Sequence, residues 1–385
     1  MTVPRLARTE FAGPTSGELL LLGPSLGTSA ATLWDRAAGQ LAEHVRVVGW
    51  DLPGHGRSDP ATSPFSIAEL AAAVLALADD IAPGATFHYA GDSLGGAVGL
   101  QLLLDAPARV LTATLLCTAS IFGPSAMWHD RAALVRDSGT GAVVDLAQQR
   151  WFAPGFTDRD PAGASALLDA LRSAHGESYA LACEALAAFD VSDRLPTIRR
   201  PVLAIAGGHD TATPTEALAR IASEVKDGRL VVLEDVAHLA PAEAPGRVAD
   251  LIVGHVKPPT LFGAGMAVRR EVLGDSHVDR AVTATTAFTT DFQHLITSYA
   301  WGSIWTRPGL DRRSRSLITL TALIARGHHE ELTMHLRAAR RNGLTNDEIK
   351  ELLLQTAIYC GVPEANSAFR IANRVLAEYD AEEAK

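Results

Sequence analysis

Residues Tyr89–Gly96 read Tyr-Ala-Gly-Asp-Ser-Leu-Gly-Gly, which places Ser93 between two glycines in a G-x-S-x-G pattern. A short apolar segment, Thr86–Ala90, precedes the pattern, and a helical run, Leu94–Leu104, follows it. This arrangement is typical of a nucleophile elbow, in which the glycines relieve crowding at a sharp turn from strand to helix. We therefore predict that Ser93 is a nucleophile and that the Leu94 amide helps to form an oxyanion hole. The alternative is a glycine-rich turn with an ordinary serine.

The chain is long enough for two domains and differs in charge along its length. It has 385 residues and a net charge of -10. From Pro258 to the end, 15 basic residues balance 15 acidic ones, so the excess of negative charge lies in the first part. An acidic first part disfavours nucleic acid as a partner, because phosphate contacts need clustered Lys and Arg. The contrast in charge also supports a boundary near Pro258.

Three kinds of sequence feature bear on the cellular location of the protein, namely membrane spans, secretory signals and paired cysteines. No apolar run reaches the length of a membrane span, and no secretory signal is visible at the N-terminus. The three cysteines lie far apart and form no C-x-x-C pair. We therefore expect a cytoplasmic protein without a membrane partner or a disulfide scaffold.

Apolar segments alternate with helical ones over the first 257 residues. This alternation predicts a doubly wound parallel sheet of the α/β class. The pattern of strands lapses between about residues 122 and 195, where helical segments predict a cap over the site. The expected strands are Leu19–Leu22, Val45–Trp50, Thr86–Ala90, Val110–Cys117, Pro201–Ala206 and Arg229–Leu233.

Two candidate partners of Ser93 each follow an expected strand. Asp210 lies in the loop after one late strand, and His238 lies in the loop after the next. The chain order Ser, Asp, His is that of the α/β-hydrolase class. In such a triad the histidine takes the proton of the serine, and the aspartate fixes the tautomer of the histidine. His209 is a rival to Asp210, but an imidazole does not supply the anion that a triad needs.

The loop after the first strand is expected to complete the oxyanion hole. Pro24 stands where the donor would be expected, but a proline has no N–H to donate. We therefore expect the second donor to be Leu26, with Ser25 beside it. Trp34 follows on a helix and either walls the site or packs in the core.

The expected cap carries aromatic and cationic side chains. Arg131 and Arg150 are candidates for binding a substrate carboxylate, although each taken alone is also consistent with a solvated helix face. Aromatic side chains would form an apolar ceiling over the substrate, and these are Trp128, Trp151, Phe152 and Phe156.

Nothing after Lys257 resembles a strand, so we expect a second, all-α domain over residues 258–385. Pro258 and Pro259 should end the last helix of the first domain and stiffen the connection. Thr345 and Glu348 are placed to cap a helix. The expected helices are Met266–Leu273, Ala281–Ala300, Arg312–Arg326, His328–Asn342, Asn346–Cys360 and Pro363–Glu378.

The second domain contains a cluster of polar residues at helical spacing. On a helix His328, Glu331 and His335 would share one face, because they are three and seven residues apart. Two imidazoles and a carboxylate can bind a metal or transfer protons. The spacing does not decide between these, because the H-E-x-x-H order is absent. A solvated polar face is the alternative.

The two parts of the chain resemble two known enzyme families. The first 257 residues resemble 3-oxoadipate enol-lactonase, an α/β-hydrolase, through Ser25–Thr28, the Ser93 elbow, Arg150–Phe152, Asp210 and His238. The second part resembles 4-carboxymuconolactone decarboxylase through Arg269–Gly274, Asp291–Gln293, Tyr299–Gly302, Arg307–Arg312 and His335–Asn366. These resemblances cover nearly the whole chain.

The resemblance implies a bifunctional enzyme of the protocatechuate branch of the 3-oxoadipate pathway, with small lactone carboxylates as substrates. The second domain would decarboxylate 4-carboxymuconolactone to the enol-lactone, and the first would hydrolyse the enol-lactone to 3-oxoadipate. No cofactor or metal is expected, because the lactone itself takes up the electrons that CO2 leaves behind. By analogy with similar helical domains we expect a homo-oligomer formed through the second domain.

The resemblance also implies roles for residues of the second domain. His328, Glu331 and His335 would deliver the proton as a unit, with His335 as the acid. In the wider superfamily two redox cysteines stand where His328 and Glu331 are, so their absence argues against peroxide reduction. Three arginines are candidates for anion binding or for structural ion pairs, namely Arg307, Arg313 and Arg315.

One residue departs from the pattern, and two alternatives stay open. Asp92 precedes the nucleophile where an apolar residue is expected, and its carboxylate would repel an anionic substrate unless it points away or is paired. The first domain could instead be a general esterase. The helical domain could be a non-catalytic module that oligomerises the hydrolase.

Overall fold

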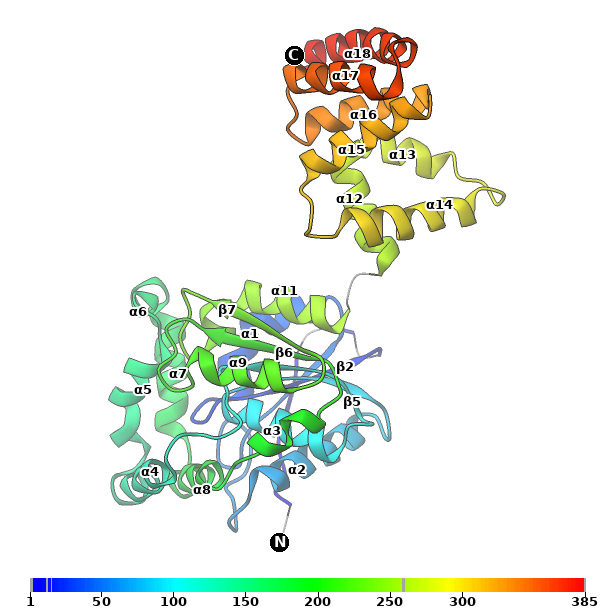
Figure 1. Cartoon of the computed structure of the whole chain (residues 1–385). Helices are drawn as coiled ribbons and strands as arrows, with labels where there is room; N and C mark the ends of the chain where they lie inside the picture. Colours follow the sequence, from blue (N-terminus) through cyan, green and yellow to red (C-terminus); the bar gives the residue numbers. More distant parts are fainter. Residues whose placement is uncertain (1–2, 12, 15, 258–259, 384–385) are drawn as a thin grey trace. The chain divides into compact units, whose positions relative to one another are not determined.

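The computed structural model describes residues 3–11, 13–14, 16–257 and 260–383. Contacts divide the chain into two units, Met1–Pro258 and Pro259–Lys385, and each is described by itself (Figure 1). The two prolines that should end the last helix of the first part, Pro258 and Pro259, lie outside the described residues.

The first unit is built on a seven-stranded sheet in the order β1-β3-β2-β4-β5-β6-β7. Every neighbouring pair is parallel except β1 with β3, so the predicted parallel sheet is confirmed and gains one antiparallel edge strand. β1 was missed because its three polar residues carry no strand pattern. The strands are β1 (Arg8–Glu10), β2 (Leu19–Gly23), β3 (Arg46–Trp50), β4 (Phe87–Asp92), β5 (Val110–Leu116), β6 (Val202–Gly207) and β7 (Gly228–Leu233).

Helices cover both faces of this sheet. Figure 1 shows α1 with α11 on one side and α2 with α3 on the other. Covering both faces explains why the central strands are continuous apolar runs, such as the fully buried Leu19–Gly23. These helices are α1 (Ala30–Leu41), α2 (Ile67–Ile81), α3 (Leu94–Asp105), α9 (Thr215–Glu224), α10 (Ala240–Glu243) and α11 (Pro245–Val256).

A group of helices is inserted between β5 and β6. They lie together at one end of the sheet in Figure 1, and α4 packs against α8. Their buried aromatic residues, among them Trp151 and Phe156, join the core of the first unit. The helices of this cap are α4 (Ser125–Ser138), α5 (Val144–Trp151), α6 (Phe156–Arg159), α7 (Pro161–Ser173) and α8 (Gly176–Ala187).

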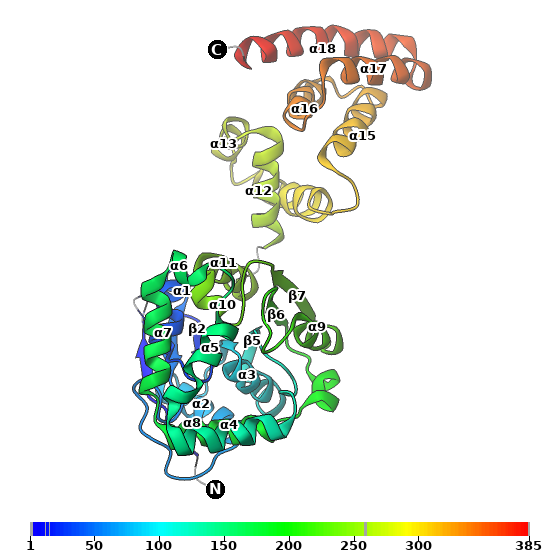
Figure 2. The same cartoon turned by 90° about the vertical axis from the view of Figure 1, so that its left-hand side faces the viewer.

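The described part of the second unit is helical throughout. Thr345 caps α17 as expected, because its hydroxyl accepts from the Glu348 N–H and the Glu348 carboxylate accepts from the Thr345 N–H. Figure 2 shows α15 to α18 arranged next to one another. The helices are α12 (Leu261–Leu273), α13 (Asp275–Thr283), α14 (Thr290–Ile296), α15 (Arg312–Ala325), α16 (His329–Arg341), α17 (Asn346–Cys360) and α18 (Val362–Glu383).

The single helix expected over Ala281–Ala300 is wrong. The chain leaves the helix after Thr283 and re-enters it at Thr290. Threonine side chains compete with the helix here, since the Thr285 hydroxyl donates to the Ala281 carbonyl and the Thr289 hydroxyl accepts from the Thr286 N–H. After α14 the chain continues as a π-helix, Thr297–Trp305. None of the described helices is long and apolar enough to cross a membrane.

Candidate active sites

The turn at Ser93 has the geometry of a nucleophile elbow. Ser93 has a φ of 54°, which non-glycine residues rarely adopt, and it lies between β4 and α3. A Cβ on Gly91 would lie 2.3 Å from the Gly95 carbonyl oxygen, and a Cβ on Gly95 would lie 2.7 Å from the Gly23 carbonyl carbon. Both glycines are therefore required for the turn to close.

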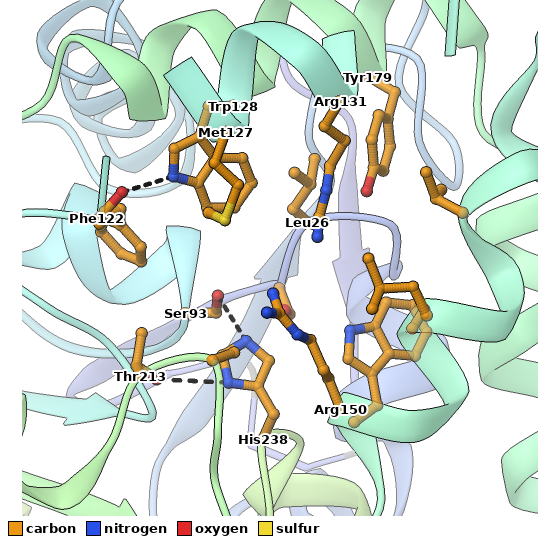
Figure 3. A pocket seen from close by; sticks show the side chains of 17 residues that line it. Leu26, Ser93, Phe122, Met127, Trp128, Arg131, Arg150, Tyr179, Thr213 and His238 are labelled. Carbon is orange, nitrogen blue, oxygen red and sulfur yellow. Dashed lines mark hydrogen bonds between the residues drawn. The ribbon is translucent and has the colours of Figure 1, made fainter. Parts of the chain in front are cut away.

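The structure brings Ser93, His238 and Asp210 together in one chain of hydrogen bonds. His238 Nε2 lies 2.9 Å from Ser93 Oγ, and His238 Nδ1 lies 2.8 Å from Asp210 Oδ2. Ser93 follows β4, Asp210 follows β6 and His238 follows β7. The carboxyl ends of these parallel strands meet at the same edge of the sheet. This is the geometry in which an imidazole can take the proton of the serine (Figure 3).

Asp210 is held as an anion by its neighbours. Burial alone would raise the pKa of Asp210, but the nearby His238 and hydrogen bonds from Thr213 lower it overall. The Thr213 hydroxyl donates to Oδ2 at 2.7 Å, and the Ala212 and Thr213 amides donate to Oδ1. Thr213 was not expected from the sequence, because a threonine three residues after an aspartate gives no distinctive signal.

The two expected oxyanion donors lie beside the serine. Leu94 opens α3 directly after Ser93, where helix N–H groups have no partner within the helix. Leu26 and Ser25 line the same pocket as Ser93. Among the described residues, no backbone acceptor is bound by the Leu26 or Leu94 N–H, so both amides are available to a ligand.

A cavity lies between Ser93 and the cap. Arg131, Arg150 and Trp151, which are candidates for contact with the substrate, line this cavity. Figure 3 shows both guanidinium groups pointing into the space next to Ser93 and His238. Within the described chain neither arginine forms an ion pair, and Arg131 lies 5.0 Å from the centre of the Trp128 ring. Two cations without carboxylate partners suit the pocket to an anion.

Of the two roles left open for Trp34, the structure favours packing in the core. Its side chain is completely buried, and its indole N–H donates to the Gly23 carbonyl at 3.0 Å. It therefore holds the end of β2, from which the expected oxyanion loop continues.

Asp92 is buried under the elbow and does not line the pocket. Neither carboxyl oxygen has a hydrogen-bond partner among the described residues. Burial raises the pKa of Asp92 well above its ordinary value, and the nearby Asp210 and Glu243 raise it further. The carboxyl group therefore favours its neutral form, so it does not present a charge to a substrate.

Glu243, which the sequence did not single out, connects the cap to the histidine loop. One carboxylate oxygen accepts from the Ala153 N–H at 2.7 Å, and the other accepts from the Ala237 N–H at 2.8 Å. The His238 N–H donates to the Trp151 carbonyl in the same region. Burial raises the pKa of Glu243 to about 7. Only the tertiary structure places Ala153 and Ala237 on either side of this carboxylate.

In the second unit, the structure does not place His328 on the helix. α16 begins at His329, and His328 is an exposed residue that precedes it with a ψ of 76°. The expected helical face of three residues is therefore wrong for His328. The preceding Gly327 has a φ of 66°, so the chain is still turning at this point.

Glu331 and His335 do lie one turn apart on α16. The His335 ring stacks on Trp301, with ring centres 6.5 Å apart. Burial, with a smaller effect of His277, lowers the pKa of His335 to about 4, while Glu331 acts in the opposite direction. The ring is thus neutral at pH 7 in the unliganded protein, so His335 does not already carry the proton of the expected acid. No group of three or more metal-ligating side chains occurs among the described residues.

Two of the three arginines expected to bind anions have structural roles instead. Arg313 pairs with Glu348 and donates to the Gly343 carbonyl. Arg315 donates to the carbonyls of Leu310 and Arg307, because the loop before α15 leaves these groups without helical partners. Arg307 is exposed, and its side chain has no partner in the described chain.

Asp92→Asn should stabilise the protein at alkaline pH. A group whose pKa is raised on folding contributes stability below its unfolded value, near 3.8, and that stability is lost as the pH rises toward the folded value. A neutral amide does not titrate, so the variant should unfold at a higher temperature than wild type at pH 8. The gain should shrink by up to about 1.4 kcal/mol per pH unit toward pH 4. Calorimetric unfolding of both proteins between pH 4 and pH 8 measures this difference in stability. If the stability of the two proteins changed equally with pH, the Asp92 carboxyl would not be neutral in the folded protein.

Glu243→Gln should weaken the connection between the cap and the histidine loop. The new amide offers one acceptor and places an NH2 group against the second backbone N–H, which costs about 1 to 3 kcal/mol. We expect a lower unfolding temperature and a lower kcat for the serine reaction. Glu216→Gln, at an exposed position on α9, is the control and should change neither. A fully active, equally stable Glu243→Gln would refute this role.

Comparisons with known proteins agree with the geometry of both units. The Alpha/beta hydrolase family matches residues 19–251, and the Carboxymuconolactone decarboxylase family matches residues 290–374. In Acinetobacter baylyi, a "3-oxoadipate enol-lactonase 2" is 34% identical over 234 residues, which are 60% of this chain and 86% of that protein. A "4-carboxymuconolactone decarboxylase" of the same organism is 47% identical over 114 residues, 30% of this chain and 85% of that protein.

A solved structure supports the first of these matches. The enol-lactonase from Burkholderia xenovorans LB400 superposes with a TM-score of 0.62 at 29% identity, covering 65% of this chain and 96% of that one. The relatives are thus matched over most of their own lengths, one by each part of the chain. The chain belongs to the alpha/beta hydrolase family in its first part and to the carboxymuconolactone decarboxylase family in its second.

Proposed function

We propose that this chain catalyses two successive steps of the protocatechuate branch of the 3-oxoadipate pathway. Its second unit decarboxylates 4-carboxymuconolactone to 3-oxoadipate enol-lactone, and its first unit hydrolyses that product to 3-oxoadipate. The observation that carries the proposal is the Ser93–His238–Asp210 triad under an arginine-lined cap, in a chain that continues into a decarboxylase family member.

Hydrolysis begins when Ser93 Oγ attacks the lactone carbonyl and His238 takes the proton. The Leu26 and Leu94 amides stabilise the oxyanion of the tetrahedral intermediate. The ring C–O bond then breaks, the leaving enolate oxygen takes the proton from His238, and the resulting enol tautomerises to a ketone, which makes ring opening effectively irreversible. Water activated by His238 cleaves the acyl-enzyme and releases 3-oxoadipate. Arg131 and Arg150 hold the carboxylate of the enol-lactone in the pocket.

Decarboxylation breaks the bond between the γ-carbon of the lactone and its carboxylate. The electron pair moves through the ring double bond into the lactone carbonyl, and protonation of the α-carbon gives the enol-lactone. His335 is neutral at pH 7 without substrate, but two substrate carboxylates nearby would raise its pKa and charge the ring. Glu331, one turn away, favours the same charged form. Arg307 is a further candidate for holding a carboxylate.

Separate substitutions should separate the two activities. Ser93→Ala should abolish lactone hydrolysis and leave CO2 release intact, because it removes only the nucleophile of the first unit. His335→Ala should do the reverse. CO2 release and ring opening are measured on the same protein supplied with 4-carboxymuconolactone.

Loss of both activities in either correctly folded variant would contradict two separate sites. Simple alkyl esters serve as the comparison substrates. A chain that cleaves these esters but not the enol-lactone would be a general esterase, with the helical unit as a non-catalytic module.

We also infer that the protein is cytoplasmic and assembles as a homo-oligomer through its second unit. Ile358 and Tyr359, at the end of α17, are each 80% exposed, and large apolar side chains at such exposure favour an interface. Replacing both with Glu should reduce the molar mass measured by light scattering of the full chain. Leu134→Glu, at a position of the first unit that is 45% exposed, is the control and should leave the molar mass unchanged. A wild-type chain that is monomeric at micromolar concentration would refute the assembly.

A further inference from the structure

In the described part of the second unit, Arg269 is a buried cation that no carboxylate pairs with. It lies on α12, and only 6% of its surface is exposed. Nη1 donates to Gln293 Oε1 and to Thr297 Oγ1, both at 3.1 Å. Nε is buried and has no partner among the described residues. A buried charge is normally paired, so a guanidinium held by neutral groups alone is costly to the folded protein.

The unpaired part of Arg269 has the donor pattern that a carboxylate recognises. Nη1 accounts for both of its hydrogen bonds in the described chain, so the edge of the guanidinium that carries Nε is left without acceptors. An edge with two parallel N–H groups binds the two oxygens of a carboxylate. The neutral partners Gln293 and Thr297 hold the plane of the guanidinium without neutralising it.

The surroundings of Arg269 also have the features of a functional site. Thr297, which fixes Arg269, begins the π-helix Thr297–Trp305, and π-helical turns are frequent at functional sites. Trp301 of the same π-helix packs with Val268 and Val272, on either side of Arg269 in α12. Trp301 also stacks on His335. His277 is close enough to both Arg269 and His335 for their charges to affect one another.

We propose that Arg269 binds the carboxylate that the substrate of the second unit retains, next to the face formed by Trp301 and His335. The inference rests on the proposed decarboxylation of a lactone dicarboxylate. Arg269 was quoted in the sequence only as part of a family resemblance, and the three arginines expected to bind anions were Arg307, Arg313 and Arg315. Its position four residues before the buried Leu273 would have placed it on the apolar face of α12.

The chemistry decides which of the two carboxylates Arg269 holds. One carboxylate leaves as CO2, its C–C bond electrons pass into the lactone, and a proton is added at the α-carbon. The other carboxylate is unchanged. Pairing an arginine with the leaving carboxylate would stabilise the ground state and oppose loss of CO2. Arg269 therefore holds the retained carboxylate, and the apolar Trp301 surface is left for the group that becomes CO2.

Kinetics of CO2 release from 4-carboxymuconolactone by the full chain test this assignment. Arg269→Met should raise KM by roughly tenfold or more, because a charge-assisted pair is lost. Arg269→Lys keeps the charge without the planar fork, so its KM should lie between those of wild type and Arg269→Met. Arg270→Met is the control, because Arg270 is the next residue of α12 and pairs with the exposed Asp275 and Asp279. It should leave KM unchanged.

Thermal unfolding and binding separate this role from a structural one. Arg269→Met should unfold no lower than wild type, because it removes a buried charge without a counter-ion. Binding is measured by titrating the full chain carrying Arg150→Met, Ser93→Ala and His335→Ala with 4-carboxymuconolactone. Adding Arg269→Met should weaken this binding by roughly tenfold or more.

The kinetic measurement and the binding titration together distinguish failure of this inference from failure of the proposed function. If wild type releases no CO2, the proposed decarboxylation fails, and the titration still decides whether Arg269 binds the lactone dicarboxylate. If Arg269→Met keeps the wild-type KM or binds the compound as tightly as its parent, the inference is overturned. A fall in unfolding temperature with unchanged KM would show that Arg269 is only structural.

Discussion

The first unit depends on the strained backbone of a single residue. Ser93 has a φ of 54°, and the turn closes only because Gly91 and Gly95 leave room for the neighbouring backbone. The turn aims Oγ at His238 and starts α3 with a free Leu94 amide. One local constraint therefore positions both the nucleophile and half of the oxyanion hole. Such strain persists only where the surrounding structure imposes it, and here the packed strands and helix do so.

Neighbouring groups set the charge of the carboxyl groups around the triad. Thr213 and His238 keep Asp210 anionic, while deep burial keeps Asp92 neutral directly under the elbow. Two carboxyl groups near one serine thus differ in charge because one has donors and the other has none. Glu243 adds a mechanical link, since its two oxygens accept from the cap and from the histidine loop.

In the described chain, both units contain cationic side chains that no carboxylate pairs with. Arg131 and Arg150 point into the pocket of the first unit, and Arg269 is buried in the second with no counter-ion among the residues that the structure describes. A substrate carboxylate would relieve the cost of each unpaired cation. Arg313, by contrast, already pairs with Glu348, so it has no charge to offer a ligand.

The sequence alone determined the parallel sheet, the elbow and the triad, because each depends on short local patterns whose order along the chain is fixed by the fold. It also predicted most helices of the second unit. The exception is the single helix expected over Ala281–Ala300, which is interrupted near Thr285, where threonine hydroxyls bond to the backbone. Tertiary structure decided what each charge does. Trp34 is buried in the core, and His328 precedes the helix on which it was expected. The partners of Glu243 and Arg269 are residues distant in the chain. Burial and partner groups set the charge and reach of a side chain, and both depend on contacts that no local pattern encodes.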